Sequence, residues 1–272
     1  MEFESSYQAK SVDAEGYVNY TAEDHEVWRL LYEQQMSILP GRACDEHFEG
    51  LVLLGLDSKA IPQLPAVNQC LRAITGWTVK PVNALISARD FFNLLANKVF
   101  PAATFIRRMD ELNYVKEPDI FHELFGHCPL LTNVNFAKFT QAYAQKVLTM
   151  PEFDWALMQR LFWFTVEFGL IQTSDGLRAY GGGILSSISE SSYSVESPLA
   201  LRAMFAPVAV MRTPYRIDQM QPIYFVIESY KQLYELMNAD FGPILEQVKC
   251  LGEYPPFFQV DENNPSIHIY AC

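Results

Sequence analysis

The chain has 272 residues, half of them hydrophobic, so it is long enough to bury a large core as one domain. Its formal net charge of −12 argues against nucleic acid or an anionic membrane as a partner, because both attract clustered lysine and arginine. Five cysteines without a CxxC pair indicate reduced thiols of a cytoplasmic protein rather than a disulfide framework. We find neither a signal peptide nor an apolar run long enough to cross a bilayer.

The first expected helix follows a polar, aperiodic stretch, residues 1–19, for which we expect a loosely ordered lead-in. Thr21 can cap this helix, and Asp24 stands at the reciprocal position of a capping box. Apolar residues then recur at helical spacing until Pro40 and Gly41 end the run.

The rest of the chain predicts more helix than strand. Helices are expected at 66–74, 88–99, 119–127, 134–149, 152–171 and 218–239, and Ser87 with Asp90 forms the cap of the helix at 88–99. Strands are expected at 51–56, 103–107, 208–211 and 257–270. The pattern indicates a mainly α fold with small β elements (α+β) and no internal repeat or flexible linker.

Two of the five histidines, His122 and His127, lie five residues apart in the segment PDIFHELFGHCP. On a straight α-helix their side chains would diverge by about 140°. Gly126 and Pro129 predict that the helix ends or distorts there, so the second imidazole can turn toward the first. The spacing differs from the HExxH pattern of zinc peptidases. Two buried structural histidines beside a solvated Glu123 remain an open alternative.

Glu167 is the one carboxylate in the apolar segment FWFTVEFGL. An ionised carboxylate in a core costs several kcal/mol unless a cation or hydrogen-bond donors meet it. An arginine, protonation or a metal ion would each satisfy Glu167. Two histidines and a distant carboxylate suit the open site of non-haem Fe(II) oxygenases. A zinc metallohydrolase and a non-catalytic ligand-binding domain are the other interpretations.

Both segments closely resemble the metal-binding segments of the pterin-dependent aromatic amino acid hydroxylases. ISARDFFNLLANKVF (86–100), AYGGGILSS (179–187) and Gln221-Pro222 resemble further segments of that family in the same order. The resemblance implies the family's catalytic-domain fold and a catalytic Fe(II) with His122, His127 and Glu167 as ligands. It also implies tetrahydrobiopterin, or a related tetrahydropterin, as the cosubstrate that reacts with O₂ while the ring of a free aromatic amino acid is hydroxylated.

The resemblance assigns binding residues as well. Positions that match the pterin site are Leu85, Ile86, Ala88, Phe91 and Glu123, with Phe91 expected to stack on the pterin; local sequence alone would place Phe91 in the core. Arg107 matches the residue that pairs with the substrate carboxylate, and Asp119 is expected either to orient Arg107 or to cap a helix. The other substrate-binding positions are Pro118, Trp163, Gly183 and Ser186, with Tyr180 as a weaker candidate of the same segment.

The chain also departs from the animal members of that family. Phe162, Val115 and Ala88 stand where many of these have tyrosine, threonine and serine. We expect residues 1–272 to form a single catalytic domain without a regulatory domain or a tetramerisation helix, as a monomer or simple dimer. This short form resembles the bacterial phenylalanine-hydroxylating members, which favours conversion of L-phenylalanine to L-tyrosine in phenylalanine catabolism. Tyrosine or tryptophan hydroxylation remains open.

Overall fold

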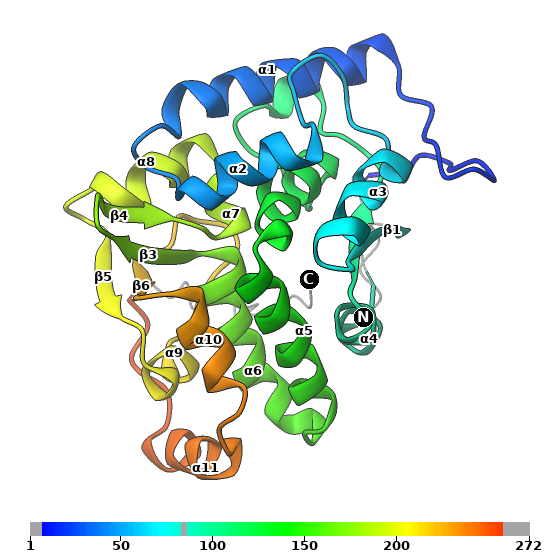
Figure 1. Cartoon of the computed structure of the whole chain (residues 1–272). Coiled ribbons are helices and arrows are strands. Elements are labelled where there is room, and N and C mark those ends of the chain that lie inside the picture. Colours follow the sequence, from blue (N-terminus) through cyan, green and yellow to red (C-terminus); the bar gives the residue numbers. More distant parts are fainter. Residues whose placement is uncertain (1–6, 83–85, 258–272) are drawn as a thin grey trace.

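Helix α1 (Ala22–Ile38) begins at the expected cap in the computed structural model, which describes residues 7–82 and 86–257. The Thr21 hydroxyl accepts a hydrogen bond from the backbone N–H of Asp24, and the Asp24 carboxylate accepts one from the backbone N–H of Thr21. The capping box is therefore confirmed. The helix lies across the top of the molecule (Figure 1).

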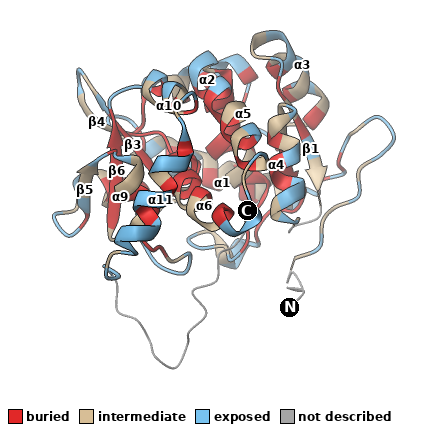
Figure 2. Cartoon of the chain, turned by 90° about the horizontal axis from the view of Figure 1, so that it is seen from below, coloured by how far each residue is buried: buried red, intermediate tan, exposed pale blue. Residues whose placement is uncertain are grey.

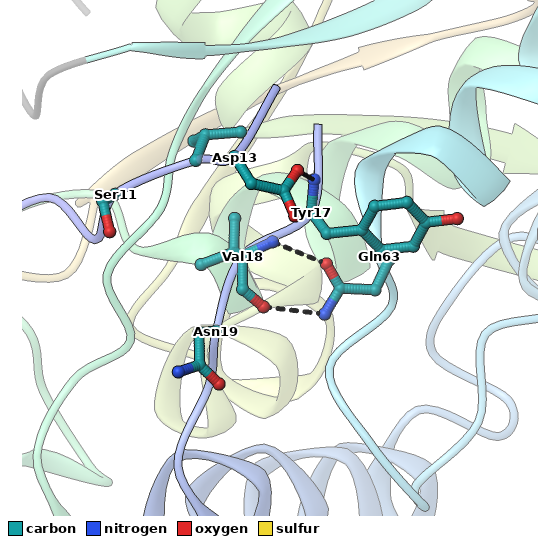
Figure 3. Close-up of a pocket in the computed structure, with 7 residues that line it drawn as sticks. Ser11, Asp13, Tyr17, Val18, Asn19 and Gln63 are labelled. Carbon is teal, nitrogen blue, oxygen red and sulfur yellow. Dashed lines mark hydrogen bonds between the residues drawn. The ribbon is translucent and has the colours of Figure 1, made fainter. Parts of the chain in front are cut away.

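The described part of the lead-in, from residue 7 onward, packs against the rest of the protein. The ring of Tyr7 stacks on Phe105 with centroids 4.5 Å apart. The side-chain amide of Gln63 accepts from the Val18 N–H at 2.9 Å and donates to the Val18 carbonyl at 3.0 Å. Figure 3 shows this pair in a surface hollow of about 460 Å³, where the Asp13 carboxylate accepts from the N–H of Tyr17. The polar groups of Gln63 and Asp13 therefore form hydrogen bonds within the chain.

Helices make up 53% and strands 12% of the fold, so the expected mainly α architecture with small β elements is confirmed. After α1 come the helices α2 (Asp45–Leu54), α3 (Leu64–Ile74), α4 (Ala88–Ala96), α5 (Val134–Leu148), α6 (Trp155–Phe162), α7 (Gly182–Leu185), α8 (Ile188–Glu196), α9 (Pro207–Arg212), α10 (Tyr230–Leu236) and α11 (Phe241–Leu251). Two π-helices, η2 (His122–His127) and η5 (Trp163–Glu167), interrupt this series, with 3-10 turns at Met109–Glu111, Cys128–Thr132 and Glu152–Asp154.

The strands form two separate sheets. β1 (Thr78–Val82) and β2 (Val99–Ala103) pair in parallel. The other sheet has the order β4 (Gly176–Ala179), β3 (Gly169–Thr173), β6 (Ile223–Ile227), β5 (Leu201–Met204). β3 runs antiparallel to β4 and parallel to β6. Figure 1 shows this four-stranded sheet on one side, α5 and α6 in the centre, and α3, α4 and β1 on the other side.

One hydrophobic cluster runs through the described chain from Val18 to Val248. All five residues of β6 are buried, as expected for a strand with neighbours on both edges. Figure 2 shows the buried residues along β3 and β6 and on one side of the surrounding helices. Among the described residues, we find no helix with the length and apolar character needed to cross a membrane.

Several helix predictions are confirmed and their ends corrected. The helices expected at 66–74, 88–99 and 134–149 are α3, α4 and α5, and the Ser87 hydroxyl caps α4 by accepting from the N–H of Asp90. The helix expected at 152–171 ends with η5, because the chain turns at Phe168 and Gly169 begins β3. The prediction of a helix at 218–239 is wrong for its first half, which contains the strand β6, and is confirmed for its second half, which contains α10.

The strand predictions were mostly wrong. The run 51–56 falls in α2 and its C-cap, and 208–211 falls in α9. Short apolar runs do not distinguish a strand from a buried helical turn, and Leu51 and Leu54 are buried at helical spacing while Val52 and Leu53 are exposed. The strand expected at 103–107 lies earlier, as β2. The strand expected at 257–270 lies, beyond Phe257, outside the described residues.

Candidate metal centre and substrate pocket

The first histidine pair sits on a π-helix. Residues His122–His127 form η2, and the N–H of Cys128 donates to the carbonyl of Glu123, five residues earlier. Because a π-helix bonds each residue to the fifth one along, side chains five apart return to the same face. The two imidazoles therefore converge, with their Nε2 atoms 3.0 Å apart. The helix distortion that the sequence predicts at this point is therefore a π-helix.

Glu167 reaches the same point from a second π-helix. α6 widens into η5 at Trp163, and the N–H of Phe168 donates to the carbonyl of Trp163. This turn presents the Glu167 carboxylate to both imidazoles: Oε1 lies 3.1 Å from His127 Nε2, and Oε2 lies 3.7 Å from His122 Nε2. The structure thus brings the three expected ligands together in the interior.

The three donor atoms fit one metal ion. Imidazole and carboxylate donors lie about 2.0–2.2 Å from a bound transition metal, so two donors at right angles are about 3 Å apart. The Nε2–Nε2 and Nε2–Oε1 distances of 3.0 and 3.1 Å match that spacing. Three donors on one face leave the opposite face open, as the non-haem Fe(II) oxygenase arrangement requires.

Glu123 is a second carboxylate beside this centre, since the ligand atoms of His122, Glu123 and His127 lie within 4.8 Å of one another. The pKa values of the two carboxyl groups are shifted in opposite directions. Burial, and then the negative charges of Glu167 and Asp119, raise the pKa of Glu123 well above its ordinary value. Burial also acts to raise the pKa of Glu167, but attraction to His127 and a hydrogen bond from it outweigh burial, so this pKa is lowered. Of the two, Glu167 is therefore the carboxyl group whose ionised form its surroundings favour.

His122 is uncharged at neutral pH, because burial and then repulsion from His127 lower its pKa to about 4. Its Nδ1 lies 2.9 Å from the hydroxyl of Ser186, which itself donates to the carbonyl of Gly182 at 2.8 Å. Because the Ser186 hydroxyl donates its proton to Gly182, its oxygen accepts a hydrogen bond from Nδ1–H of His122. The neutral imidazole then has no proton on Nε2, so the lone pair of Nε2 faces Glu167. A buried carboxylate facing an imidazole lone pair is an arrangement that a cation stabilises.

Arg107 and Asp119 form a buried pair next to η2. Arg107 donates from Nε at 2.8 Å and from one terminal nitrogen at 2.9 Å to the two carboxylate oxygens of Asp119. Asp119 also accepts from the backbone N–H of His122 at 3.0 Å, so it both orients Arg107 and caps the helical turn that leads into η2. Burial opposes ionisation of Asp119, but the charge and hydrogen bonds of Arg107 outweigh it and lower the pKa. The outer edge of the guanidinium still has hydrogens to offer a second carboxylate.

The aromatic residues of the expected pocket come from the segment around η5. Trp163 is buried, stacked on Tyr215 with centroids 4.3 Å apart. Gly183 packs on Phe168, where a Cβ would lie 2.8 Å from the ring. Pro118 is half-buried directly before Asp119. Gly183 and Trp163 thus both pack on Phe168, the residue that follows Glu167.

Tyr180 is fully buried, and its ring contacts Phe136 and Tyr230. On the expected pterin side, Phe91 is buried on α4, with its ring edge-on to Phe92 and Phe162. The contact with Phe162 joins α4 to the segment of Glu167. Ala88 begins this helix and Ile86 precedes its cap; both are half-buried, and Leu85 lies outside the described residues.

Sequence reasoning missed two sets of residues at this site. Gly182, which packs on His127, lies within the matched glycine run, but we assigned it no role. The second set is Gln221 and Glu190. Gln221 accepts a hydrogen bond from the indole of Trp163, and Glu190 accepts one from the backbone N–H of Gln221. The Gln221-Pro222 match was the one signal, and it did not indicate which atom Gln221 binds.

Comparison with known proteins settles the family. Residues 3–258 match the family model of biopterin-dependent aromatic amino acid hydroxylases. The chain belongs to this family. It is 46% identical to the phenylalanine-4-hydroxylase of Pseudomonas aeruginosa over 254 residues, which are 93% of this chain and 97% of that protein.

Solved structures agree. Phenylalanine hydroxylase from Legionella pneumophila is 60% identical, with a TM-score of 0.90 over 92% of this chain and 100% of that chain. The phenylalanine hydroxylase of Chromobacterium violaceum with bound oxidised Fe(III) is 43% identical, with a TM-score of 0.85 over 90% of this chain and 91% of that one. The expected resemblance is confirmed, so this hydroxylase depends on biopterin and acts on an aromatic amino acid. Family membership argues against a zinc hydrolase and against a non-catalytic binding domain.

Proposed function

We propose that this hydroxylase converts L-phenylalanine to L-tyrosine with O₂ and tetrahydrobiopterin, or a related tetrahydropterin, at an Fe(II) bound by His122, His127 and Glu167. The observation that carries the proposal is the convergence of three donor atoms, His122 Nε2, His127 Nε2 and Glu167 Oε1, from two π-helices. The choice of phenylalanine is supported by the relatives, including one whose structure holds Fe(III).

The chain's own residues have distinct tasks in this reaction. Arg107, already oriented by Asp119, holds the substrate carboxylate through the guanidinium hydrogens that do not bind Asp119. Trp163 and Pro118 border the substrate ring, and Gly183 and Ser186 border its backbone. Iron and reduced pterin, when bound, supply the activation of O₂.

The pterin is proposed to lie near Phe91, with Leu85, Ile86 and Ala88 around it. Because the pKa of the Glu123 carboxyl group is raised, its protonated form is favoured, and that form can donate a hydrogen bond toward the pterin. Phe91, Trp163, His127 and Glu167 are buried and His122 is half-buried, which limits the access of water to the region proposed for the substrate ring.

The setting of the reaction is also a proposal. We propose a single catalytic domain acting in phenylalanine catabolism in the cytoplasm, as a monomer or simple dimer and without nucleic acid. All cysteines that the structure describes are free thiols, which supports a reducing compartment: Cys44, Cys70, Cys128 and Cys250. Light scattering of the purified protein measures its oligomeric state.

Product analysis tests the function. The iron-loaded protein is incubated with tetrahydropterin, air and each of the three aromatic amino acids, and the products and O₂ uptake are measured. We expect tyrosine from phenylalanine as the main product. His122→Ala and Glu167→Gln should lose iron and activity, whereas His25→Ala, outside the centre, should keep both. A main product from tyrosine or tryptophan would overturn the substrate, and full iron occupancy in both ligand variants would overturn the site.

A further inference from the structure

The indole of Trp163 is fixed on its ring and at its nitrogen. The ring stacks on Tyr215, tilted by 15°, and contacts Phe168 with centroids 4.6 Å apart. The indole Nε1–H donates to the side-chain oxygen of Gln221 at 3.0 Å. A buried indole has to place its N–H on an acceptor, so Gln221 determines which way the ring is turned.

Gln221 is itself held in one orientation. Its side chain is buried, and its Nε2 donates to the backbone carbonyls of Arg216 at 2.6 Å and Gln219 at 3.2 Å. If the amide were flipped, its oxygen would face two carbonyl oxygens and its NH₂ would face the indole N–H. The amide therefore has a single orientation in which every partner is satisfied, and that orientation points the oxygen at Trp163.

Glu190 joins this unit to the other side of the pocket. Its carboxylate, which is buried, accepts from the backbone N–H of Gln221 at 3.0 Å and from the hydroxyl of Tyr224. Glu190 lies in the first turn of α8, where its N–H donates to the hydroxyl of the capping Ser187. That cap follows directly on Ser186, which contacts His122. Trp163 and the segment of Ser186 are thus connected through three hydrogen bonds, Trp163 to Gln221, Gln221 to Glu190 and Glu190 to Ser187.

We infer that Gln221 is a positioning residue that fixes the indole plane of Trp163 and thereby sets how firmly the enzyme holds the aromatic ring of its substrate. The inference rests on the proposed function, in which Trp163 borders that ring. Contact between two rings depends on their relative tilt, so an indole free to rotate loses part of this contact. Arg107, which is proposed to hold the substrate carboxylate, makes no hydrogen bond to Gln221 among the contacts of the described residues. Substitution of Gln221 is therefore not expected to change the binding of the carboxylate or of the pterin.

Gln221→Met tests this, because methionine keeps the length of the side chain and removes the amide. We expect the KM for L-phenylalanine to rise about tenfold, which corresponds to the loss of one buried hydrogen bond. The kcat and the KM for tetrahydropterin should stay within about twofold of their original values. In a Trp163→Phe background, which has no indole N–H to orient, the same change should raise the KM for L-phenylalanine less than about twofold further. Gln172→Met, at an exposed glutamine of β3, is the matched control and should change nothing.

Equal effects of Gln221→Met in the two backgrounds, or equal rises in the KM for phenylalanine and for pterin, would overturn the inference. If Gln221→Met does not fold, hydrogen exchange of the Trp163 indole N–H in the unaltered enzyme decides: slow exchange supports the inference, and exchange as fast as in an exposed indole overturns it. Failure of the proposed function is distinguishable, because the unaltered enzyme would then form no tyrosine at all.

Discussion

Gly182 lies directly against the imidazole of His127: a Cβ built on Gly182 would stand 2.3 Å from Cε1 and 2.4 Å from Nδ1. No side chain can approach that closely without moving the ring or the backbone. The neighbouring Gly181 has the same relationship to the Glu167 carbonyl, at 2.3 Å. The glycine run thus lets one backbone segment pack closely against two of the proposed metal ligands, His127 and Glu167.

Gly182→Ala is therefore expected to displace His127 and weaken Fe(II) binding by at least about tenfold, the usual effect of disturbing the support of a metal ligand. Overpacking should also lower the free energy of unfolding by about 1–3 kcal/mol. Iron titration and denaturant unfolding measure both. Gly242→Ala is the control, because its Cβ would lie 3.3 Å from the movable side chain of Asp240. Unchanged iron affinity in Gly182→Ala would contradict the prediction.

Ser186→Ala should weaken iron binding without unfolding the protein. The Ser186 hydroxyl accepts the Nδ1 proton of His122, so its loss allows that ring to turn or to move its proton to Nε2, the atom that faces Glu167. We expect a loss of about 10- to 100-fold in Fe(II) affinity. Ser37→Ala, on the exposed side of α1, serves as the comparison. If the two variants bind iron equally well, Ser186 does not determine the tautomer.

The parts of this fold that the sequence predicted are those set by neighbours in the chain. The caps at Thr21 and Ser87 depend on residues three positions away, and both helices begin as expected. The assembly of the metal centre was foreseeable in outline because an isolated carboxylate, Glu167, in an apolar segment needs a partner. The turns that place it were not, since a π-helix depends on packing around the whole segment.

The parts that the sequence did not predict depend on residues from other segments. The run at 51–56 is apolar enough for a strand, but α2 packs it against the turn Cys128–Thr132, where Gly50 meets the backbone of Pro129. Likewise Gln221 reads as an ordinary polar residue until the fold places it beside Trp163. In both cases the deciding partner is remote in the chain, so local propensity carries no information about it.

Arg107→Lys should raise the KM for the amino acid substrate by about tenfold or more while leaving the KM for tetrahydropterin unchanged. Lysine keeps the positive charge next to Asp119 but cannot bind Asp119 and a second carboxylate through two parallel pairs of hydrogen bonds. Steady-state kinetics with each substrate varied in turn measures the two constants. Arg108→Lys is the matched control, because Arg108 is exposed and pairs with Asp110 and Glu111. Equal rises in both KM values would remove Arg107 from the substrate site.

His47 should make the protein sensitive to acid. It is fully buried on α2 against Phe125, and within the described part of the chain neither ring nitrogen has a hydrogen-bond partner. Burial lowers its pKa from about 6.5 to about 3. The folded protein therefore keeps His47 neutral while the unfolded chain binds a proton, so its contribution to stability is complete above pH 6.5 and is lost as the pH falls toward 3.

His47→Leu removes this titration. Near pH 5 the unaltered protein should have lost about 2 kcal/mol of unfolding free energy through His47, relative to pH 7.5, and the variant should lack this part of the decrease. Urea unfolding of both proteins from pH 7.5 to 5, with a chelator present so that metal release does not contribute, measures the difference. The other histidines are common to both proteins and cancel. Parallel stability curves over this range would show that His47 is hydrated or paired in solution and carries no such penalty.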